Sequence, residues 1–315
     1  RLTSRTAAMT GSSYVGRFAP SPSGPLHLGS LLAAVASFLD ARANEGLWLV
    51  RIEDIDPPRE PAGAADEILT QLHHFGLTWD GEVLYQSQRL DAYAAALMIL
   101  ANEGLCFRCE CTRSALREHG TVYSGHCRIH GLSARDLQYA DKHPDSSDAA
   151  VRLRVGSDTY SLHDRIQGAY AQTLNTDVGD FVVRRKDGLI AYQLAVVVDD
   201  AFQGITDIVR GIDLLDSTPR QLYLQDRLGY NAPRYAHLPV VVDAAGDKLS
   251  KQSFAPALEL GHSQQQLHQC LSLLGLSPPR NLVTGSVDAI LAWGIEHWDI
   301  QAVPKLATLI APSSV

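Results

Sequence analysis

The stretch "GRFAPSPSGPLHLGS", residues 16–30, decides the fold of this chain. It holds three prolines and three glycines, and it runs directly into the alanine- and leucine-rich segment "LLAAVASFLDARA", residues 31–43. A plain connecting turn needs one or two such residues, whereas this loop stiffens some positions with proline and frees others with glycine. A histidine, His27, stands where a helix is expected to begin. We interpret the stretch as a loop that wraps a nucleotide.

The sequence on either side of this loop predicts a βαβ unit. "SYVGRFAP" (13–20) is typical of a short strand, residues 31–45 of a buried helix, and "LWLVRIEDID" (47–56) of a second strand. A right-handed crossover then places both strands in one parallel sheet. The loop lies at the carboxyl edge of that sheet, where α/β proteins bind their ligands.

The rest of the chain continues the alternation of helices and strands. We predict helices over 64–75, 90–103 and 219–228, strands at 151–155 and 180–185, and a helical composition after Gly246. A continuous apolar run within 191–211 returns to a strand pattern, and there we expect the parallel sheet to resume. The predicted fold is α/β, with a Rossmann-type parallel-sheet nucleotide-binding domain split by an insertion. The expected units are 10–105 and 181–245 for the two halves, 106–180 for the insertion, and 246–315 for a helical carboxyl-terminal region.

Composition limits the class of protein. The 315 residues are 45% hydrophobic and carry a formal net charge of -8, which argues against a broad nucleic-acid-binding surface. A polyanionic partner would have to meet a local basic patch, and the densest basic region is 113–186, although a solvated face explains it equally well. No apolar run approaches the ~18–20 residues that span a bilayer. We therefore expect a soluble, cytoplasmic protein without membrane contact, and a monomer.

Four of the five cysteines fall in one short window. An odd, clustered set in a chain without a secretory signal indicates metal ligands rather than disulfides. Zn²⁺ prefers four thiolate or imidazole ligands in a tetrahedron. Spacing alone selects a four-thiolate site, with three histidines in reserve: Cys106, Cys109, Cys111 and Cys127, then His119, His126 and His130. The alternative is a set of reduced cysteines packed in a core.

Two short motifs far apart in the chain favour a phosphate-binding function. His27 in "PLHLGS" stands at a helix amino end, where backbone N–H groups attract phosphate, although it could equally be a simple cap. "GDKLSKQ" (246–252) has two lysines three residues apart and suits a triphosphate, although alone it is best explained as an exposed charged turn. Their occurrence in one chain favours a nucleotide site.

These motifs, taken together, resemble those of a known family. "APSPSGPLHLGS" and "KLSKQ" are similar to the HIGH and KMSKS motifs of class I aminoacyl-tRNA synthetases, and "RIEDID", "VVVDD" and "IVRGIDLLDSTPRQ" narrow the resemblance to the glutamyl/glutaminyl branch. The resemblance runs from about 15 to 254. Only the 64 residues 252–315 follow Lys251, too few for an anticodon-binding domain of ~100–150 residues. The chain thus resembles the truncated paralogues, the glutamyl-Q tRNA(Asp) synthetases, in which "RIEDIDPPRE" and "CECTR" also occur.

The resemblance implies an activity. It implies ATP-dependent, tRNA-independent activation of L-glutamate to glutamyl-adenylate, followed by transfer to the queuosine at the wobble position of tRNA(Asp). Two alternatives remain: a truncated glutamyl-tRNA synthetase that charges the 3′ end of tRNA(Glu), and a non-catalytic zinc- and nucleotide-binding regulator. The first motif here is HLGS, so Ser30 stands where many class I enzymes have a second histidine.

The resemblance also implies site residues. His27 would hydrogen-bond the phosphates and Lys251 would hold the departing pyrophosphate, with Mg²⁺ accompanying ATP. Three further residues are expected at ATP: Gly29, Lys248 and Ser250. Eight are expected at glutamate: Arg17, Phe18, Ala19, Pro20, Ser21, Glu53, Tyr192 and Arg210. In this set the arginines bind the side-chain carboxylate of glutamate and Glu53 binds its ammonium group. The region 246–315 would hold the KMSKS-like loop and a stem-contacting helical part.

For the metal, the family pattern differs from spacing alone. It implies one structural Zn²⁺ held by Cys109, Cys111, Tyr123 and Cys127, and leaves Cys106 as the alternative fourth ligand. A tyrosine ligand is unusual because its phenol must lose a proton with an ordinary pKa of about 10. A small insertion with little apolar content gains a staple from such an ion.

Overall fold

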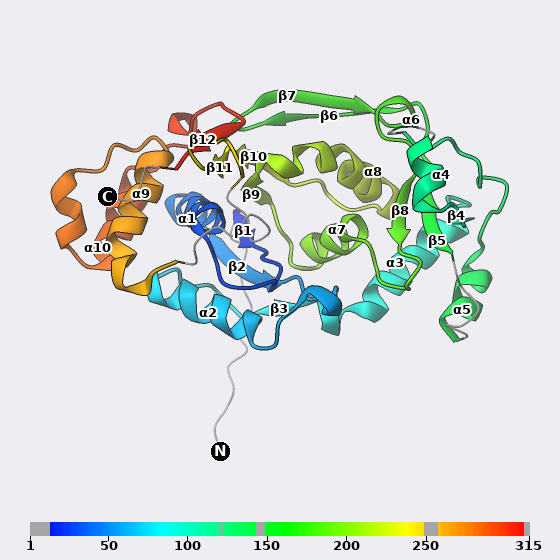
Figure 1. Ribbon diagram of the computed structural model, residues 1–315, viewed down its shortest axis with the longest axis horizontal. Coiled ribbons are helices and arrows are strands. Elements are labelled where there is room, and N and C mark those ends of the chain that lie inside the picture. Colours follow the sequence, from blue (N-terminus) through cyan, green and yellow to red (C-terminus); the bar gives the residue numbers. More distant parts are fainter. Residues whose placement is uncertain (1–12, 119, 121, 143–148, 249–257, 312–315) are drawn as a thin grey trace, which may run out of the picture.

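The computed structural model describes residues 13–118, 120, 122–142, 149–248 and 258–311. Its centre is a parallel sheet, around the labels β1, β2 and β9 in Figure 1. Strand β1 (Val15–Phe18) pairs in parallel with β2 (Leu47–Ile52), and β2 pairs in parallel with the short β3 (Leu84–Tyr85). Helix α1 (Leu28–Ala43) connects the first two strands. The predicted βαβ unit is therefore confirmed, although its helix begins three residues earlier than expected.

The second half of the sheet comes from a distant part of the chain. Strand β9 (Asp207–Gly211) pairs in parallel with β10 (Arg234–Leu238), and helices α7 (Tyr192–Phe202) and α8 (Thr218–Leu228) flank them. Thr206 joins this half to β1: its Oγ1 accepts a hydrogen bond from Val15 N at 2.8 Å, and its N donates to Val15 O at 2.9 Å. The two halves therefore form one layer.

The apolar run before β9 forms a helix, and the sheet resumes only after it. Every residue from Leu194 to Asp200 in α7 is buried. A helix buried on all sides shows no 3.6-residue alternation of polar and apolar positions, so its sequence cannot be distinguished from that of a buried strand. The prediction that the parallel sheet resumes in this region is right for β9, but the preceding run of valines is helical.

The inserted segment builds a second, antiparallel sheet, at the right of Figure 1. After α2 (Ala64–His74) and α3 (Leu90–Asn102), strands β4 (Cys106–Cys109), β5 (Ala150–Leu153) and β8 (Phe181–Arg184) pair in that order. Three short helices belong to the same region: α4 (Arg113–Glu118), α5 (Ala134–Lys142) and α6 (Leu174–Asp177). Because β8 belongs to this sheet, the sheet extends beyond residue 180.

A two-stranded ribbon leaves the insertion and returns to the central layer. It consists of β6 (Thr159–Asp164) and β7 (Gly168–Thr173), and it runs along the top of Figure 1 from α6 to the region of β10. The turn of this hairpin, residues 164–168, lies against β10: Gln167 Nε2 donates to His237 O at 2.9 Å, and Ile166 is buried in the main core. The far end of the insertion is thus connected to the centre of the protein.

The carboxyl-terminal region, at the left of Figure 1, is mostly helical. It contains β11 (Val240–Val242), α9 (Ser263–Leu273), α10 (Val287–Glu296) and β12 (Thr308–Ile310). Strand β12 pairs in parallel with β11, so the expectation of a helical composition to the end is wrong at this strand. Six short 3₁₀ segments complete the described chain: 57–59, 86–88, 212–217, 260–262, 280–284 and 300–302.

Two hydrophobic clusters hold these parts together. The larger one lies around α1 and includes Trp48, with α9 and α10 packed on it, and the second lies between α3, α7 and the antiparallel sheet. Helix α1 is buried continuously from Ala34 to Ala41, as expected of a helix inside an α/β core. Within the described part of the chain, no helix combines the length and the apolar character that crossing a bilayer requires.

Candidate functional site

His27 begins helix α1 and caps it. Its backbone is extended, and its Nδ1 accepts hydrogen bonds from Gly29 N (3.1 Å) and Ser30 N (3.4 Å). Ser30 Oγ in turn accepts from His27 N at 2.8 Å, which completes a reciprocal capping box. Since Nδ1 is an acceptor, the neutral ring carries its proton on Nε2. The cap thereby places the ring donor of His27 at the positive end of a buried helix.

The lysine-rich loop is the segment that contains "GDKLSKQ" (246–252). The described residues at its two ends, Lys248 and Leu258, lie near the central sheet and the start of α1. After the loop, Leu258 N donates to Leu26 O at 3.2 Å, next to His27. At its beginning, Lys248 Nζ forms an ion pair of 2.5 Å with Asp213, which closely follows Arg210 and β9. Ser250 and Lys251 lie outside the described residues. The chain thus enters the loop beside one half of the central sheet and leaves it beside the other.

A cluster of buried charges lies at the carboxyl ends of β1 and β2. Arg17 Nε contacts Asp200 Oδ1 at 3.0 Å, and Arg51 Nη1 contacts the same oxygen at 2.8 Å. Arg51 Nη2 also reaches Glu53 Oε1 at 3.3 Å. All four side chains are buried. Asp200 lies on α7, so this cluster connects the first half of the sheet to the helix of the second half.

The two carboxylates of this cluster are tuned in opposite directions. Burial raises the pKa of Glu53, and the nearby Arg51 and Arg17 offset this only in part. Burial would also raise the pKa of Asp200, but Arg17 and Arg51 outweigh it and lower that pKa. The two arginines therefore stabilise the charge of Asp200, whereas a further cation beside Glu53 would stabilise its ionised form.

Tyr192, the first residue of α7, faces the same space. Burial raises the pKa of its hydroxyl, and the charges that act on the hydroxyl are Arg210, Glu53, Arg17 and Asp200. The phenol thus lies among four residues, which come from β1, β9, α7 itself and the position directly after β2. The structure brings together the two arginines, the glutamate and the tyrosine that the sequence motifs assigned to glutamate binding.

Arg210, on β9, is held from two sides. Its Nε donates to His237 Nε2 at 3.0 Å, and its Nη2 donates to Thr218 Oγ1 at 2.8 Å. The remaining nitrogen, Nη1, is buried and has no hydrogen-bond partner among the described residues. A buried guanidinium N–H without an acceptor is costly. This atom is the clearest mark of a site for an anionic ligand.

The other residues expected at glutamate are divided between backbone and core. Phe18 points into the main core, where its ring stacks on Trp48 at 6.4 Å between centroids, so only its backbone borders the loop. Pro20 O accepts a hydrogen bond from Glu53 N at 3.0 Å, which ties the loop to β2. Ala19 is half-buried and Ser21 is exposed. The loop therefore contributes shape rather than charge.

Several residues of the site have no strong signal in the sequence. Arg51 and Asp200 lie inside motifs that served only to identify a family, and neither was assigned a contact. His237 and Thr218, which hold Arg210, were not singled out. A buried pair such as Asp200 and Arg17 is separated by 183 positions in the chain, and only the fold places them together.

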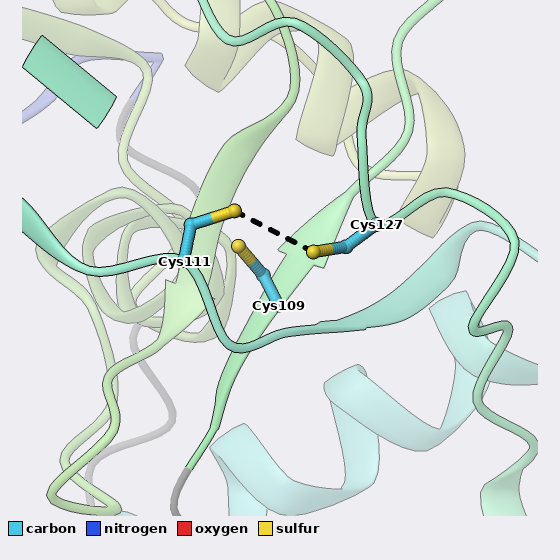
Figure 2. A group of neighbouring side chains, drawn as sticks. All are labelled: Cys109, Cys111 and Cys127. Atoms are coloured by element: carbon cyan, nitrogen blue, oxygen red, sulfur yellow. Dashed lines mark hydrogen bonds between the residues drawn. The ribbon is translucent and has the colours of Figure 1, made fainter. Parts of the chain in front are cut away.

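Three cysteines gather in the inserted segment, as Figure 2 shows. The Sγ atoms of Cys109, Cys111 and Cys127 lie within 4.8 Å of one another, and Cys111 Sγ is 3.5 Å from Cys127 Sγ. Cys109 ends β4, Cys111 follows it, and Cys127 approaches from a separate loop. Cys109 and Cys127 are buried and Cys111 is half-buried. Such a group could hold a metal ion.

Tyr123 adds a fourth atom to the cysteines. Its hydroxyl is 3.6 Å from Cys109 Sγ and 3.8 Å from Cys111 Sγ. A tetrahedral zinc site with ordinary bond lengths has ligand-to-ligand edges of about 3.5–3.8 Å. The cysteine cluster is defined as Cys109, Cys111, Cys127 and the Tyr123 hydroxyl. Three of its distances, the two from the hydroxyl and the one from Cys111 Sγ to Cys127 Sγ, match those edges.

Cys106 lies away from this cluster. Residues 106 and 109 are three apart on β4, so their side chains point to opposite faces of the strand. Cys106 packs in the core beside α3 and α7, where burial raises the pKa of its thiol to about 12. Burial would raise the pKa of the Cys109 thiol, but its hydrogen bonds with Tyr123 and Arg152 outweigh burial and lower that pKa. Of the two, Cys109 is the better prepared thiolate ligand.

Comparison with known proteins places this geometry in a family. Residues 14–283 match the family of tRNA synthetases class I (E and Q), catalytic domain. In overall fold the chain is similar to a glutamate tRNA ligase from Elizabethkingia meningosepticum, crystallised in complex with its amino acid, with a TM-score of 0.77 and 24% identity. That similarity covers 95% of this chain and 68% of the other.

Closer relatives match almost end to end. The glutamyl-Q tRNA(Asp) synthetase of Pseudomonas paraeruginosa is 53% identical over 298 residues, which are 95% of this chain and 98% of the relative. The protein of the same name from Pseudomonas fluorescens is 52% identical over 307 residues, or 98% of each chain. The chain therefore belongs to the glutamyl-Q tRNA(Asp) synthetases, a family within the class I tRNA synthetases.

Proposed function

We propose that this protein activates L-glutamate with ATP in the absence of tRNA and transfers the glutamate to the queuosine of tRNA(Asp). The observation that carries the proposal is the near end-to-end similarity to proteins of that name, at 53% identity. The buried Arg210 Nη1, beside Arg17, Glu53 and Tyr192, supports glutamate as the amino acid.

Glutamate has two anionic ends and one cationic group, and the site offers complements to them. Arg210 presents a buried donor for the side-chain carboxylate, and a planar guanidinium suits a carboxylate better than an ammonium does. Glu53, whose pKa burial raises, gains a cation when the α-ammonium approaches. Arg17 adds positive charge, although its Nε and Nη2 contact Asp200.

The activation step requires alignment rather than a general base. The α-carboxylate of glutamate is already ionised and attacks the α-phosphorus of ATP. A carboxylate-to-phosphorus bond forms, the bond from that phosphorus to the bridging oxygen breaks, and pyrophosphate leaves with the electron pair. The protein must hold the two substrates in line and neutralise phosphate charge.

The amino end of α1 is the proposed phosphate contact. His27, with its proton on Nε2, donates to a phosphate oxygen, and Gly29 allows the chain to approach the nucleotide closely. The lysine-rich loop would supply Lys248, Ser250 and Lys251, and Lys251 would hold the departing pyrophosphate. Mg²⁺ enters as part of the MgATP substrate.

The transfer step completes the reaction. A hydroxyl oxygen of the queuosine attacks the carbonyl carbon of glutamyl-adenylate and forms an ester. The bond from that carbon to the phosphate oxygen breaks, AMP leaves with the electron pair, and the proton of the hydroxyl passes to solvent. The resulting tRNA is modified at the anticodon rather than charged at its 3′ end.

We also infer a structural zinc site at the cysteine cluster. Cys109, Cys111, Cys127 and Tyr123 would hold the ion, because the three Sγ atoms converge within 4.8 Å and the Tyr123 hydroxyl lies 3.6 Å and 3.8 Å from two of them. When bound, Zn²⁺ supplies a crosslink between β4 and the loop that carries Cys127, without entering the reaction.

The first test measures activation alone. Pyrophosphate exchange into ATP is followed without tRNA, with glutamate, glutamine and aspartate compared at equal concentrations. We expect exchange with glutamate and at least tenfold less with the other two, because the amide lacks the charge that Arg210 compensates and aspartate is one methylene shorter. Absence of glutamate-dependent exchange would refute the enzyme and favour a regulatory protein.

The second test identifies the acceptor. Labelled glutamate is offered with tRNA(Asp) that contains queuosine, with the same tRNA lacking queuosine, and with tRNA(Glu). We expect stable label only on the first. Equal labelling of tRNA(Asp) without queuosine, or labelling of tRNA(Glu), would instead support a truncated glutamyl-tRNA synthetase that acts at the 3′ end.

A further inference from the structure

Hydrogen bonds connect Arg210, through His237, to the turn between β6 and β7. His237, on β10, is fully buried, and its Nδ1 is 2.6 Å from Asp164 Oδ2. Asp164 is the last residue of β6 and is also buried. An unbroken chain of contacts therefore runs from Asp164 through His237 to Arg210, whose Nη1 borders the amino-acid site.

The hydrogen bond between Arg210 and His237 fixes the tautomer of the His237 ring. Arg210 Nε has a single N–H and cannot accept, so His237 Nε2 must be the acceptor of that 3.0 Å bond. The ring proton therefore lies on Nδ1 and is donated to Asp164. An imidazolium would instead direct a second donor at the guanidinium.

Asp164 is in turn held by the backbone. Its Oδ1 accepts hydrogen bonds from Ile166 N (3.0 Å), Gln167 N (2.9 Å) and His237 N (3.1 Å). Its Oδ2 is thereby directed at the imidazole. The carboxylate is satisfied at both oxygens, and each bond comes from the hairpin turn or from β10. The orientation of the ring is therefore set by the turn between β6 and β7, which belongs to the inserted segment.

We propose that Asp164 and His237 are positioning residues that hold Arg210 with Nη1 aimed at the side-chain carboxylate of glutamate. The pair acts through Arg210 and touches no substrate. With Thr218 on Nη2 and His237 on Nε, the guanidinium has one nitrogen left for the ligand and little rotational freedom. A preorganised donor binds its anion more tightly than one that must be ordered on binding. This proposal rests on the proposed function, in which glutamate is the ligand.

Asp164→Asn is the sharpest test, because it inverts the tautomer. Asparagine has one carbonyl oxygen, and three backbone N–H groups compete for it, so its amide NH₂ group faces His237 Nδ1. The ring must then accept at Nδ1 and carry its proton on Nε2, where it opposes Arg210 Nε–H. We expect KM for glutamate in pyrophosphate exchange to rise at least tenfold, with kcat and KM for ATP changed less than twofold.

Two substitutions of His237 and one control separate positioning from stability. His237→Leu removes the acceptor and should reproduce the rise in KM. His237→Gln supplies an amide oxygen near the place of Nε2, and it should recover KM to within about threefold of the wild type. Asp80→Asn is the matched control: Asp80 also accepts a backbone N–H, from Trp48 at 2.8 Å, but remote from the site. It should leave KM unchanged. The proposal would be overturned if KM for glutamate and KM for ATP changed equally, or if neither changed in any variant.

A spectroscopic readout makes the outcome independent of activity. In ¹⁵N-labelled protein, the ring nitrogens of His237, assigned by their loss in His237→Gln, should report the Nδ1–H tautomer in the wild type. They should report Nε2–H in Asp164→Asn. If the wild type shows no glutamate-dependent exchange, the proposed function fails, and this tautomer measurement alone decides the positioning pair. An Nε2–H or doubly protonated ring in the wild type at pH 7.5 would refute the pair whatever the activity.

Discussion

The amino-acid site, formed by Arg17, Glu53, Tyr192 and Arg210, differs from the cysteine cluster in where its residues lie along the chain. The first draws its residues from strands and helices spread over most of the chain, for example Arg17 on β1 and Arg210 on β9. The second draws all of its residues from 109–127, a single short segment. The first site has ion pairs and hydrogen bonds between its side chains and their buried neighbours. The second has three sulfur atoms and one oxygen that converge, held by hydrogen bonds from Arg152 Nε to Cys109 Sγ (3.3 Å) and from Cys127 N to the Tyr123 hydroxyl (2.9 Å).

The two sites differ in what stabilises their local structure. Arg17 is next in sequence to Phe18 of the larger hydrophobic cluster, and Asp200 lies on α7, which contributes residues 196–198 to the second, so packing holds both charges in place. Around the cysteine cluster the core consists of three buried residues, Phe107, Cys109 and Cys127. So small a core contributes little stability, and we expect a bound ion to contribute the rest.

The largest expected effect tests the preorganised site. Arg210→Ala should lower kcat/KM for glutamate roughly 10²–10³-fold, because a buried donor to a carboxylate is lost. Arg210→Lys keeps the charge but not the planar fork, and it should recover only a small part of the activity. Melting temperature and KM for ATP serve as controls. A variant with kcat/KM within threefold of the wild type would contradict the role of Arg210.

The next effect tests the ion-dependent region. Cys127→Ser should reduce bound zinc from about one ion per chain to a small fraction, and lower the melting temperature by several degrees, because one corner of the tetrahedron is lost. Cys106→Ser should retain the zinc, since its side chain lies on the other face of β4. Zinc content by elemental analysis decides between them, and the opposite pattern would favour the four-thiolate site.

A smaller effect separates the two roles of His27. Asparagine is a good N-cap, so His27→Asn should preserve stability while removing the ring donor, and kcat for pyrophosphate exchange should fall roughly 10–100-fold. His27→Ala should lose the cap as well, at a cost of about 1 kcal/mol in the free energy of unfolding. Unchanged kcat in the asparagine variant would show that His27 is a cap alone.

The smallest effect is a pH dependence of stability. Burial lowers the pKa of His237 below its ordinary 6.5; Asp164 opposes this and Arg210 adds to it, with Asp213 and the stacked ring of Tyr235 also facing the imidazole. The unfolded chain therefore binds more protons below pH 6.5, and the free energy of unfolding falls as pH falls from 6.5 towards the folded pKa.

Urea denaturation at several pH values between 5 and 7 measures this dependence. His237→Gln should show a shallower decline than the wild type over the same interval, by less than about 1.4 kcal/mol per pH unit. Parallel curves for the two proteins would mean that other groups carry the pH dependence.

Local signals in the sequence were sufficient for the capped helix and for the thiols. The loop before His27, the helix and the strand after it lie within 40 residues, and their order alone predicts a parallel βαβ unit. The clustering of cysteines likewise indicates a metal site. The choice between Cys106 and Tyr123 needed the strand: only when 106–109 is known to be extended do residues 106 and 109 point apart.

Interactions over long distances in the chain had no such signal. Asp200 is the counterion of Arg17 because α7 is a buried helix, whereas its run of valines gave no helical period. Asp164 belongs to an exposed ribbon by its place in the chain, and it reaches His237 only because the hairpin turn packs against β10. No spacing rule connects positions 164, 210 and 237.

By itself the sequence determined the βαβ unit, the capping histidine, the family and the set of thiols, because these depend on residues that are neighbours along the chain. The tertiary structure decided which charges meet in the core, which atom of Arg210 remains for a ligand, and which face of β4 turns to the cysteine cluster. Burial gives such contacts their strength, since a charge or a donor removed from water must find a partner wherever the fold brings one.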